Sequence, residues 1–212
     1  MDKWVYQSFK CPNCGAVRLY NHRHLFDAQK DKKDFHGIVS GEYLTVQCPR
    51  CNKIFVDYGF VYKDRKRKKV MVFDTKESIL TNFGMNEFPL DELYTITDIK
   101  DVYDCLFAID HKLNWWVIKL YKLARIKDFL ELSKEKGFKD LTLGRVYLYE
   151  EKRKTMLYIE LKNENYCARD NLTKKMYKTF LKDWLEKAHV YIKKNYCLDE
   201  QYALDNIIDK ED

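Results

Sequence analysis

The apolar positions in the first third of the chain fall in short runs, whereas those after residue 98 recur at helical spacing. β-branched and aromatic residues, broken by turn signals, predict strands at KWVYQSF, AVRLY, EYLTVQ, KIFVDYGFVY and KKVMVF. The polar stretch HLFDAQKDKKDFHGIV, which follows the second of these runs, predicts a short helix that ends near Gly37. DRKRKK at 64–69 lies between two apolar runs, as the connection of a β-hairpin does.

Further along the chain, apolar side chains at steps of three and four predict helical faces. One face carries Ile99, Val102, Leu106, Ile109 and Leu113, and the next carries Trp116, Leu120, Leu123, Ile126 and Leu130. RVYLYE and TMLYIEL flank EKRK at 151–154 and predict a second hairpin. A last amphipathic helix is predicted from Leu172, Met176, Phe180, Trp184 and Ala188, with Asp170 or Asn171 as its N-cap. The acidic end, DNIIDKED, is predicted to fray.

These patterns predict an α+β protein built from two modules. Residues 1–80 are a predicted β module, which contains the inserted short helix. Residues 81–97 are the predicted connector, and residues 98–212 are a helical module that contains a β-hairpin.

The charge of the chain is mildly basic and evenly spread. The 212 residues include 39 Lys and Arg against 33 Asp and Glu, a formal net charge of +6. A dedicated nucleic-acid binder concentrates positive charge more strongly than this. The start, MDKWVYQSFK, lacks the pattern of a signal peptide, and no apolar run reaches the roughly 18 residues of a membrane span. We therefore expect a cytoplasmic protein with no membrane partner.

Two Cys-Pro-x-Cys pairs carry the strongest chemical signal in the sequence. They are Cys11 with Cys14 and Cys48 with Cys51. Two intervening residues let both sulfurs of a pair reach one tetrahedral ion, with Zn–S bonds of about 2.3 Å. Cysteines in a reducing compartment are more often metal ligands than disulfides. The four cysteines therefore predict one Zn²⁺ site of the zinc-ribbon type.

The predicted metal is structural rather than catalytic, because four thiolates leave no open position for water or substrate. Gly15 and Asn52 follow the two pairs, where the backbone of such a turn tends to adopt positive φ. His22 and His24 offer a mixed Cys/His alternative, but the segment NHRH beside a predicted turn favours surface residues. Two redox Cys-x-x-Cys pairs are a further alternative, although neither pair precedes a helical pattern as a redox pair does.

CPNCG, SGEYLTVQCPRCNK and the run ending in VYKDRKRKKVMVF resemble the CpXC domain of bacterial and archaeal proteins, a family named for its two Cys-Pro-x-Cys pairs. In that family the second pair follows a Gly-Glu-[Leu/Tyr] segment and precedes a Tyr-x-Asp turn, here residues 41–43 and 62–64. The resemblance covers about residues 10–125, and Asn52 departs from the second glycine of the pattern. It implies a zinc-ribbon-like fold with a metal site and implies no activity.

The basic cluster in DRKRKK is the second candidate site. Its members are Arg65, Lys66, Arg67, Lys68 and Lys69, which would meet nucleic-acid phosphates beside exposed aromatic rings. A solvated hairpin turn is the alternative, and the similar composition of EKRK in the second hairpin favours it.

Other residues with chemical potential indicate packing rather than a site. Cys105 adjoins the first helical face and is predicted to lie in the core. Trp116 fits the next face, and Trp115 lies about 100° from it, either at an interaction surface or against the hairpin. Asp104 is predicted to be a surface charge. No G-x-S-x-G, P-loop, G-x-G-x-x-G or H-E-x-x-H motif occurs, so the sequence leaves enzymatic activity open and leans against it.

Two functions fit these observations. The favoured one is a zinc-stabilised, non-catalytic binding or adaptor protein whose C-terminal module presents a surface to an unknown protein partner. The alternative is a nucleic-acid-binding zinc-ribbon protein that uses its basic hairpin turns.

Overall fold

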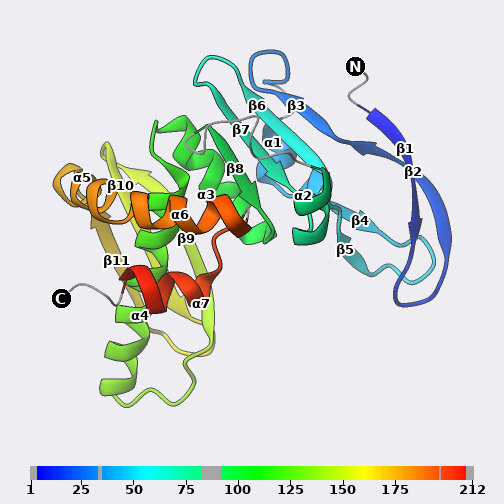
Figure 1. The fold of residues 1–212 in the computed structure, drawn as a ribbon. Coiled ribbons are helices and arrows are strands. Elements are labelled where there is room, and N and C mark those ends of the chain that lie inside the picture. Colours follow the sequence, from blue (N-terminus) through cyan, green and yellow to red (C-terminus); the bar gives the residue numbers. More distant parts are fainter. Residues whose placement is uncertain (1–3, 33–34, 83–91, 196, 209–212) are drawn as a thin grey trace. The chain divides into compact units, whose positions relative to one another are not determined.

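The structure, a computed structural model, describes residues 4–32, 35–82, 92–195 and 197–208 (Figure 1). The chain divides into two compact units, Met1–Cys105 and Leu106–Asp212. The division falls within helix α3 (Ile99–Asp110). The first unit is rich in strands and the second combines helices with a sheet, which confirms the predicted α+β class. No helix in the described ranges is long and apolar enough to cross a bilayer.

Two separate two-stranded ribbons in the first unit hold the cysteine pairs. Strands β1 (Trp4–Lys10) and β2 (Val17–Arg23) are antiparallel, with Lys10 opposite Val17. Strands β4 (Thr45–Gln47) and β5 (Ile54–Val56) are also antiparallel, with Gln47 opposite Ile54. Each ribbon is closed at its tip by one Cys-Pro-x-Cys turn, because the residues between its strands are 11–16 in one case and 48–53 in the other.

A four-stranded mixed sheet supplies most of the core of the first unit. Its order is β3 (Leu25–Asp27), β6 (Phe60–Asp64), β7 (Lys69–Phe73) and β8 (Leu93–Ile96), with β6 and β7 antiparallel and both edge strands parallel to their neighbours. Its largest fully buried side chains are those of Phe26, Phe60, Met71, Phe73, Leu93 and Tyr94. The β6–β7 hairpin confirms the turn predicted at 64–69.

The helical segments of the first unit are short. They are α1 (Phe35–Val39), the 3-10 turn η1 (Glu42–Leu44) and α2 (Lys76–Asn82). The helix predicted between the cysteine pairs exists as α1, which contains Gly37 and ends two residues after it. Glycine is needed inside this helix because a Cβ atom at Gly37 would run into the ring of Tyr43. Part of the predicted connector, Leu93–Ile96, is strand β8, and residues 83–91 of it lie outside the described residues.

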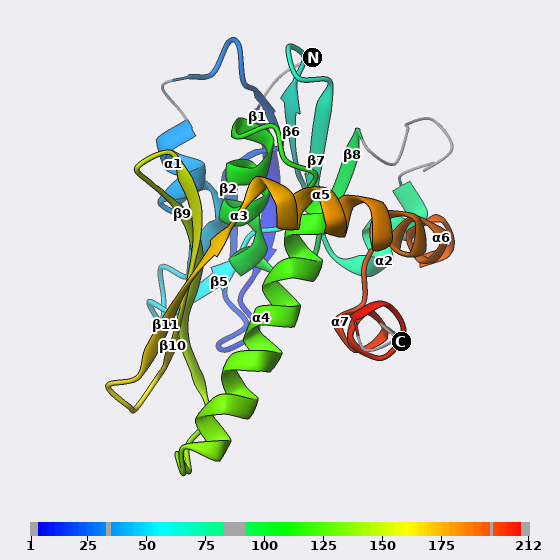
Figure 2. The same cartoon turned by 90° about the vertical axis from the view of Figure 1, so that its left-hand side faces the viewer.

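The second unit is organised around the long helix α4 (Trp115–Glu135). One side of α4 packs on the antiparallel sheet β9 (Leu143–Glu151), β10 (Lys154–Leu161) and β11 (Cys167–Leu172). The other side meets α6 (Leu185–Asn195) and the π-helical turn η3 (Leu204–Ile208), and α5 (Lys174–Asp183) packs on it as well. Figure 2 shows α4 between the sheet and α6 and α7 (Glu200–Ala203).

This arrangement settles one expectation about the second unit and corrects another. Trp116 is fully buried, as predicted, and so is Trp115, for which a surface position and burial against the hairpin were both open. The last amphipathic helix begins later than predicted. Cys167–Leu172 pairs with β10 as strand β11, so the N-cap is Thr173, whose hydroxyl accepts the Met176 N–H at 3.2 Å. The helix also breaks at Trp184 to give α5 and α6. The predicted EKRK hairpin is present as β9 and β10.

Candidate metal centre

The first cysteine turn is fixed by backbone hydrogen bonds around Cys11. The Gly15 N–H donates to the Cys11 carbonyl at 2.9 Å, and the Cys11 N–H donates to the Ala16 carbonyl at 2.8 Å. Gly15 has φ 70°, in the left-handed region that glycine adopts at low cost. Pro12 lies inside this turn, where its missing N–H donor costs nothing to the ribbon pairing.

The second turn repeats this geometry at Cys48. The Asn52 N–H donates to the Cys48 carbonyl at 2.9 Å, and the Cys48 N–H donates to the Lys53 carbonyl at 2.9 Å. Asn52 has φ 58°, which asparagine tolerates better than most residues. The positive φ expected after each pair is therefore present in both turns.

The two ribbons bring the four sulfur atoms together. All four Sγ atoms lie within 4.8 Å of one another. Cys11 Sγ is 3.7 Å from Cys51 Sγ, and Cys14 Sγ is 3.6 Å from Cys48 Sγ, so each close pair joins one ribbon to the other. Zn–S bonds of about 2.3 Å in a tetrahedron place the sulfurs about 3.8 Å apart. The four cysteines are thus spaced to hold one tetrahedral ion, and all four are free thiols.

Backbone dipoles around the cluster favour the thiolate form that a metal binds. The Cys51 N–H contributes most to lowering the pKa of Cys48, to about 6. The Lys53 N–H likewise lowers the pKa of Cys51. The Ala16 N–H lowers the pKa of Cys14, but burial and the neighbouring sulfurs outweigh it and raise this pKa to about 11. A divalent cation that binds here would displace the protons that remain on these thiols.

A family comparison agrees with this geometry. The family model described as CpXC protein matches residues 9–112, which include both cysteine turns. Residues 9–112 form a CpXC domain. This confirms the resemblance seen in the sequence. The CpXC match takes in both ribbons and the four-stranded sheet and ends two residues after α3, so most of the second unit lies outside it. No curated protein and no solved structure matches the chain.

The two histidines near the CpXC cysteines do not join the cluster. Among the described residues, the four cysteines are the group of metal-ligating side chains that lie together. His22 is not a surface residue as expected, since it is 3% exposed and His24 is half-buried. His22 Nδ1 lies 2.9 Å from Asp57 Oδ2, and Nε2 lies 3.1 Å from the Gly59 carbonyl.

Both partners of His22 can only accept, so both bonds form when the ring carries two protons. Burial lowers the pKa of His22, but the hydrogen bonds that its ring donates to Asp57 and to the Gly59 carbonyl, together with the negative charge of Asp57, outweigh burial and raise this pKa. The Tyr20 hydroxyl donates to the other Asp57 oxygen at 2.6 Å. A buried ion pair thus ties β2 to the segment after β5, and so joins the two cysteine ribbons at their bases. The alternation of Tyr20 and His22 along the strand places them on one face, but nothing local in the sequence identified Asp57 as their partner.

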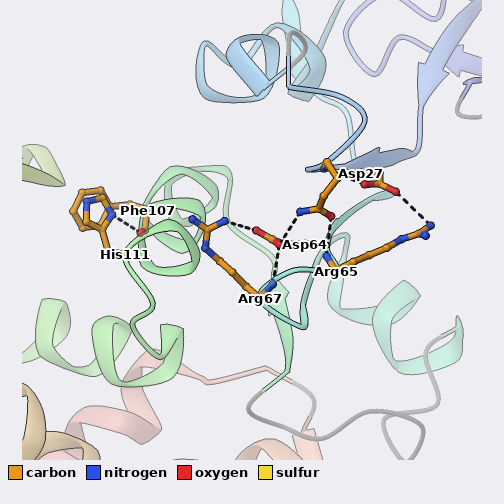
Figure 3. Close-up of polar contacts among 7 residues, drawn as sticks. Asp27, Asp64, Arg65, Arg67, Phe107 and His111 are labelled. Atoms are coloured by element: carbon orange, nitrogen blue, oxygen red, sulfur yellow. Dashed lines mark hydrogen bonds and ion pairs between the residues drawn. The ribbon is translucent and has the colours of Figure 1, made fainter.

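The basic β6–β7 turn is partly neutralised (Figure 3). The Arg67 guanidinium lies 2.7 Å from buried Asp64, and that of Arg65 lies 3.3 Å from Asp27. Burial raises the pKa of Asp64, but the Arg67 N–H and guanidinium outweigh it and hold this pKa below its usual range. Of the other predicted nucleic-acid residues, Lys66 and Lys68 are exposed, and the Lys69 ammonium lies 5.3 Å from the centre of the Tyr94 ring.

The remaining candidates are placed outside the cluster. Cys105 is fully buried, which confirms the core prediction, whereas Cys167 is exposed and Cys197 is half-buried. Asp104 was expected at the surface but is 1% exposed. It lies on the same helix as the buried Leu106 and Ile109, and a single carboxylate within a helical pattern gave no sign of its burial.

Proposed function

We propose that the CpXC domain binds one structural Zn²⁺ through Cys11, Cys14, Cys48 and Cys51, and that the protein is a non-catalytic adaptor. The observation that carries the metal proposal is the near-tetrahedral spacing of four sulfurs, with 3.7 and 3.6 Å between the ribbons. Among metals that accept four thiolates, zinc is favoured because structural zinc sites commonly use this ligand set. The set is complete without water or substrate, which argues for a scaffold role.

The short strands beside the cysteines explain why a metal is needed there. β4 and β5 have three residues each, and Ile54 at the start of β5 is 65% exposed. Ribbons of this size bury too little apolar surface to be stable alone. Structural zinc contributes on the order of 10 kcal/mol to folding in comparable small modules.

All seven cysteines are free thiols, which supports our proposal of a reducing, cytoplasmic setting.

The adaptor proposal rests on an exposed apolar face of the β1–β2 ribbon. Tyr6, Val17 and Leu19 are 80%, 65% and 72% exposed. The register places Tyr6 opposite Asn21, two residues from Leu19 and four from Val17, so all three side chains share one face of the ribbon. Contiguous apolar surface of this kind marks protein interaction sites in many proteins. The ion pairs of Arg65 and Arg67 further favour a protein partner over nucleic acid, because paired cations are less available to phosphates.

The metal is tested by elemental analysis and native mass spectrometry of the purified chain. We expect one zinc per chain, and we expect Cys48→Ser to lose it. Cys167→Ser is the matched control, because Cys167 is exposed and lies outside the cluster. A folded chain that contains no metal, or full zinc occupancy in Cys48→Ser, would refute the four-thiolate site.

The partner is tested by affinity capture from the native host with wild-type protein and with a Tyr6→Lys, Leu19→Lys double variant. We expect at least one protein to be retained by the wild type and lost with the double variant. Val190→Lys serves as the control, since Val190 is 56% exposed on α6 in the other unit. Capture that is the same for all three chains contradicts the ribbon surface. DNA or RNA binding that falls steeply with log[salt] would favour the nucleic-acid alternative instead.

A further inference from the structure

A cavity of about 400 Å³ in the second unit is lined by apolar surface together with several cations and hydrogen-bond donors. Its wall is formed by the β9–β10 turn, the end of β11, the first turn of α5 and the residues between α3 and α4. The cavity has the size of a site for a small organic ligand. It lies wholly in Leu106–Asp212, so nothing in it depends on the proposed metal centre.

Positive charge exceeds negative charge in this cavity. Arg153, Lys154 and Lys174 line it and form no ion pair within the part of the chain that the structure describes. Glu150 is the lining carboxylate, and it is engaged by His111 Nε2 at 3.0 Å. Arg153, Lys154 and Lys174 against Glu150 leave an excess of two positive charges, without counting His111. Such an excess attracts an anion and matches a dianion best.

Tyr177 adds a donor that has no acceptor among the described residues. Its hydroxyl oxygen accepts the Asn114 N–H at 2.7 Å, and this bond leaves the hydroxyl proton free to be donated elsewhere. Burial raises the pKa of Tyr177, so the hydroxyl keeps that proton at neutral pH. Tyr177 lines the cavity together with Leu113 and Leu172, whose apolar side chains suit an organic group beside the anion.

The backbone conformation of the β9–β10 turn is a further observation beside this cavity. Lys152 has φ 49° and Arg153 has φ 64°, so both central residues of this two-residue turn are in the left-handed region. Turns of this type strongly prefer Asn-Gly, because other side chains are strained there. The turn nevertheless carries two cations, and Arg153 lines the cavity. Residues held in strained backbone conformations cluster at binding and active sites, so the strain adds to the charge and the cavity without deciding the matter alone.

We propose that this cavity binds a small organic phosphate monoester. Arg153, Lys154 and Lys174 neutralise the phosphate, and the Tyr177 hydroxyl donates to one of its oxygens. Leu113 and Leu172 contact the organic group. A guanidinium and two ammonium groups suit phosphate oxygens. The cavity also lies at the N-terminal end of α5, where the helix dipole favours an anion.

The test is a titration of the full-length, ¹⁵N-labelled protein with phenyl phosphate and with inorganic phosphate, followed by NMR. We expect saturable shifts in residues 111–113, 150–155 and 171–177, with phenyl phosphate binding more tightly than inorganic phosphate. Arg153→Gly and Lys174→Gln should each weaken binding about tenfold. Arg153→Gly relieves backbone strain, so its loss of binding would not come from unfolding. Lys178→Gln is the control, because Lys178 is an exposed lysine of the same helix that does not line the cavity.

Three results would overturn the proposal. They are no saturable shifts at high millimolar ligand, binding that Arg153→Gly and Lys174→Gln leave unchanged, and tighter binding of a single-stranded oligonucleotide than of phenyl phosphate. The last result would assign the cations to a nucleic-acid surface.

Discussion

Replacing Arg153, one of the two central residues of the β9–β10 turn, with glycine should make the protein more stable. Lys152 and Arg153 both have positive φ, at 49° and 64°. A side chain with a Cβ atom costs roughly 1–2 kcal/mol in this region, and glycine avoids that cost. Glycine also gives the unfolded chain more freedom, which removes about 0.4–1 kcal/mol of the gain. We therefore expect Arg153→Gly to raise the free energy of unfolding by about 1 kcal/mol.

The measurement is urea unfolding at equilibrium, with calorimetry as a second readout. For a chain of this length, a gain of 1 kcal/mol corresponds to roughly 2–4 °C in Tm. Lys68→Gly is a matched positive control, because Lys68 has φ 54° in the β6–β7 turn of the other unit and does not line the cavity. It should stabilise the protein without changing phosphate binding.

Arg153→Ala separates backbone strain from charge repulsion. Alanine removes the charge but keeps the Cβ atom, so the strain at φ 64° remains. We expect no gain in stability from Arg153→Ala. If it stabilises the protein as much as Arg153→Gly does, the strain argument is wrong and repulsion among the lysines and arginine is the cause. If Arg153→Gly gives no gain at all, the turn does not hold Arg153 in the left-handed region.

Three further predictions concern the first unit. Removing the metal with a strong chelator should unfold the two cysteine ribbons, because structural zinc contributes on the order of 10 kcal/mol to folding. The readout is loss of amide-exchange protection in residues 4–23 and 45–56. Protection that persists after the metal is shown to be gone contradicts this prediction. The His22–Asp57 pair should stabilise the protein most at low pH, because folding raises the pKa of His22 above its usual value of about 6.5. The stabilisation is complete below about pH 6.5 and is lost as the pH rises through the higher pKa of the folded state. Urea midpoints measured between about pH 6 and pH 9 should show this fall for the wild type and not for His22→Gln, with half-buried His24→Gln as control. Gly37→Ala should cost about 1–3 kcal/mol, because its Cβ would meet the Tyr43 ring, and an unchanged urea midpoint would show that the ring moves aside freely.

The features that the sequence predicted correctly depend on neighbours in the chain. The positive φ of Gly15 and Asn52 follows from the turn that each Cys-Pro-x-Cys pair must make, so local residue types were enough to predict it. The hairpin at 64–69 and the apolar face of α3 were likewise set by alternation and by helical spacing. The clustering of the four sulfurs was also predictable, because a tetrahedral site requires the two pairs to meet.

The errors concern interactions between distant segments. The last helix was predicted to have its N-cap at Asp170 or Asn171. These residues instead belong to strand β11, because Cys167–Leu172 pairs with β10. His22 was assigned to the surface because its partner, Asp57, comes 35 positions later. Trp115 was left undecided because its burial depends on what covers both sides of α4, and periodicity along a single helix carries no information about that.

The two basic turns show most directly why composition alone could not identify the binding site. DRKRKK and EKRK have similar residues, and the second was taken as a reason to regard the first as solvated. In the structure the first turn is compensated, since Arg65 and Arg67 meet Asp27 and Asp64. The second turn has a cavity beside it and cations without carboxylate partners among the described residues. Whether a basic turn is a solvated loop or an anion site therefore depends on the carboxylates that lie beside it in the fold. In the first unit these come from the ends of β3 and β6, and in the cavity of the second unit the lining carboxylate is the His111-bound Glu150.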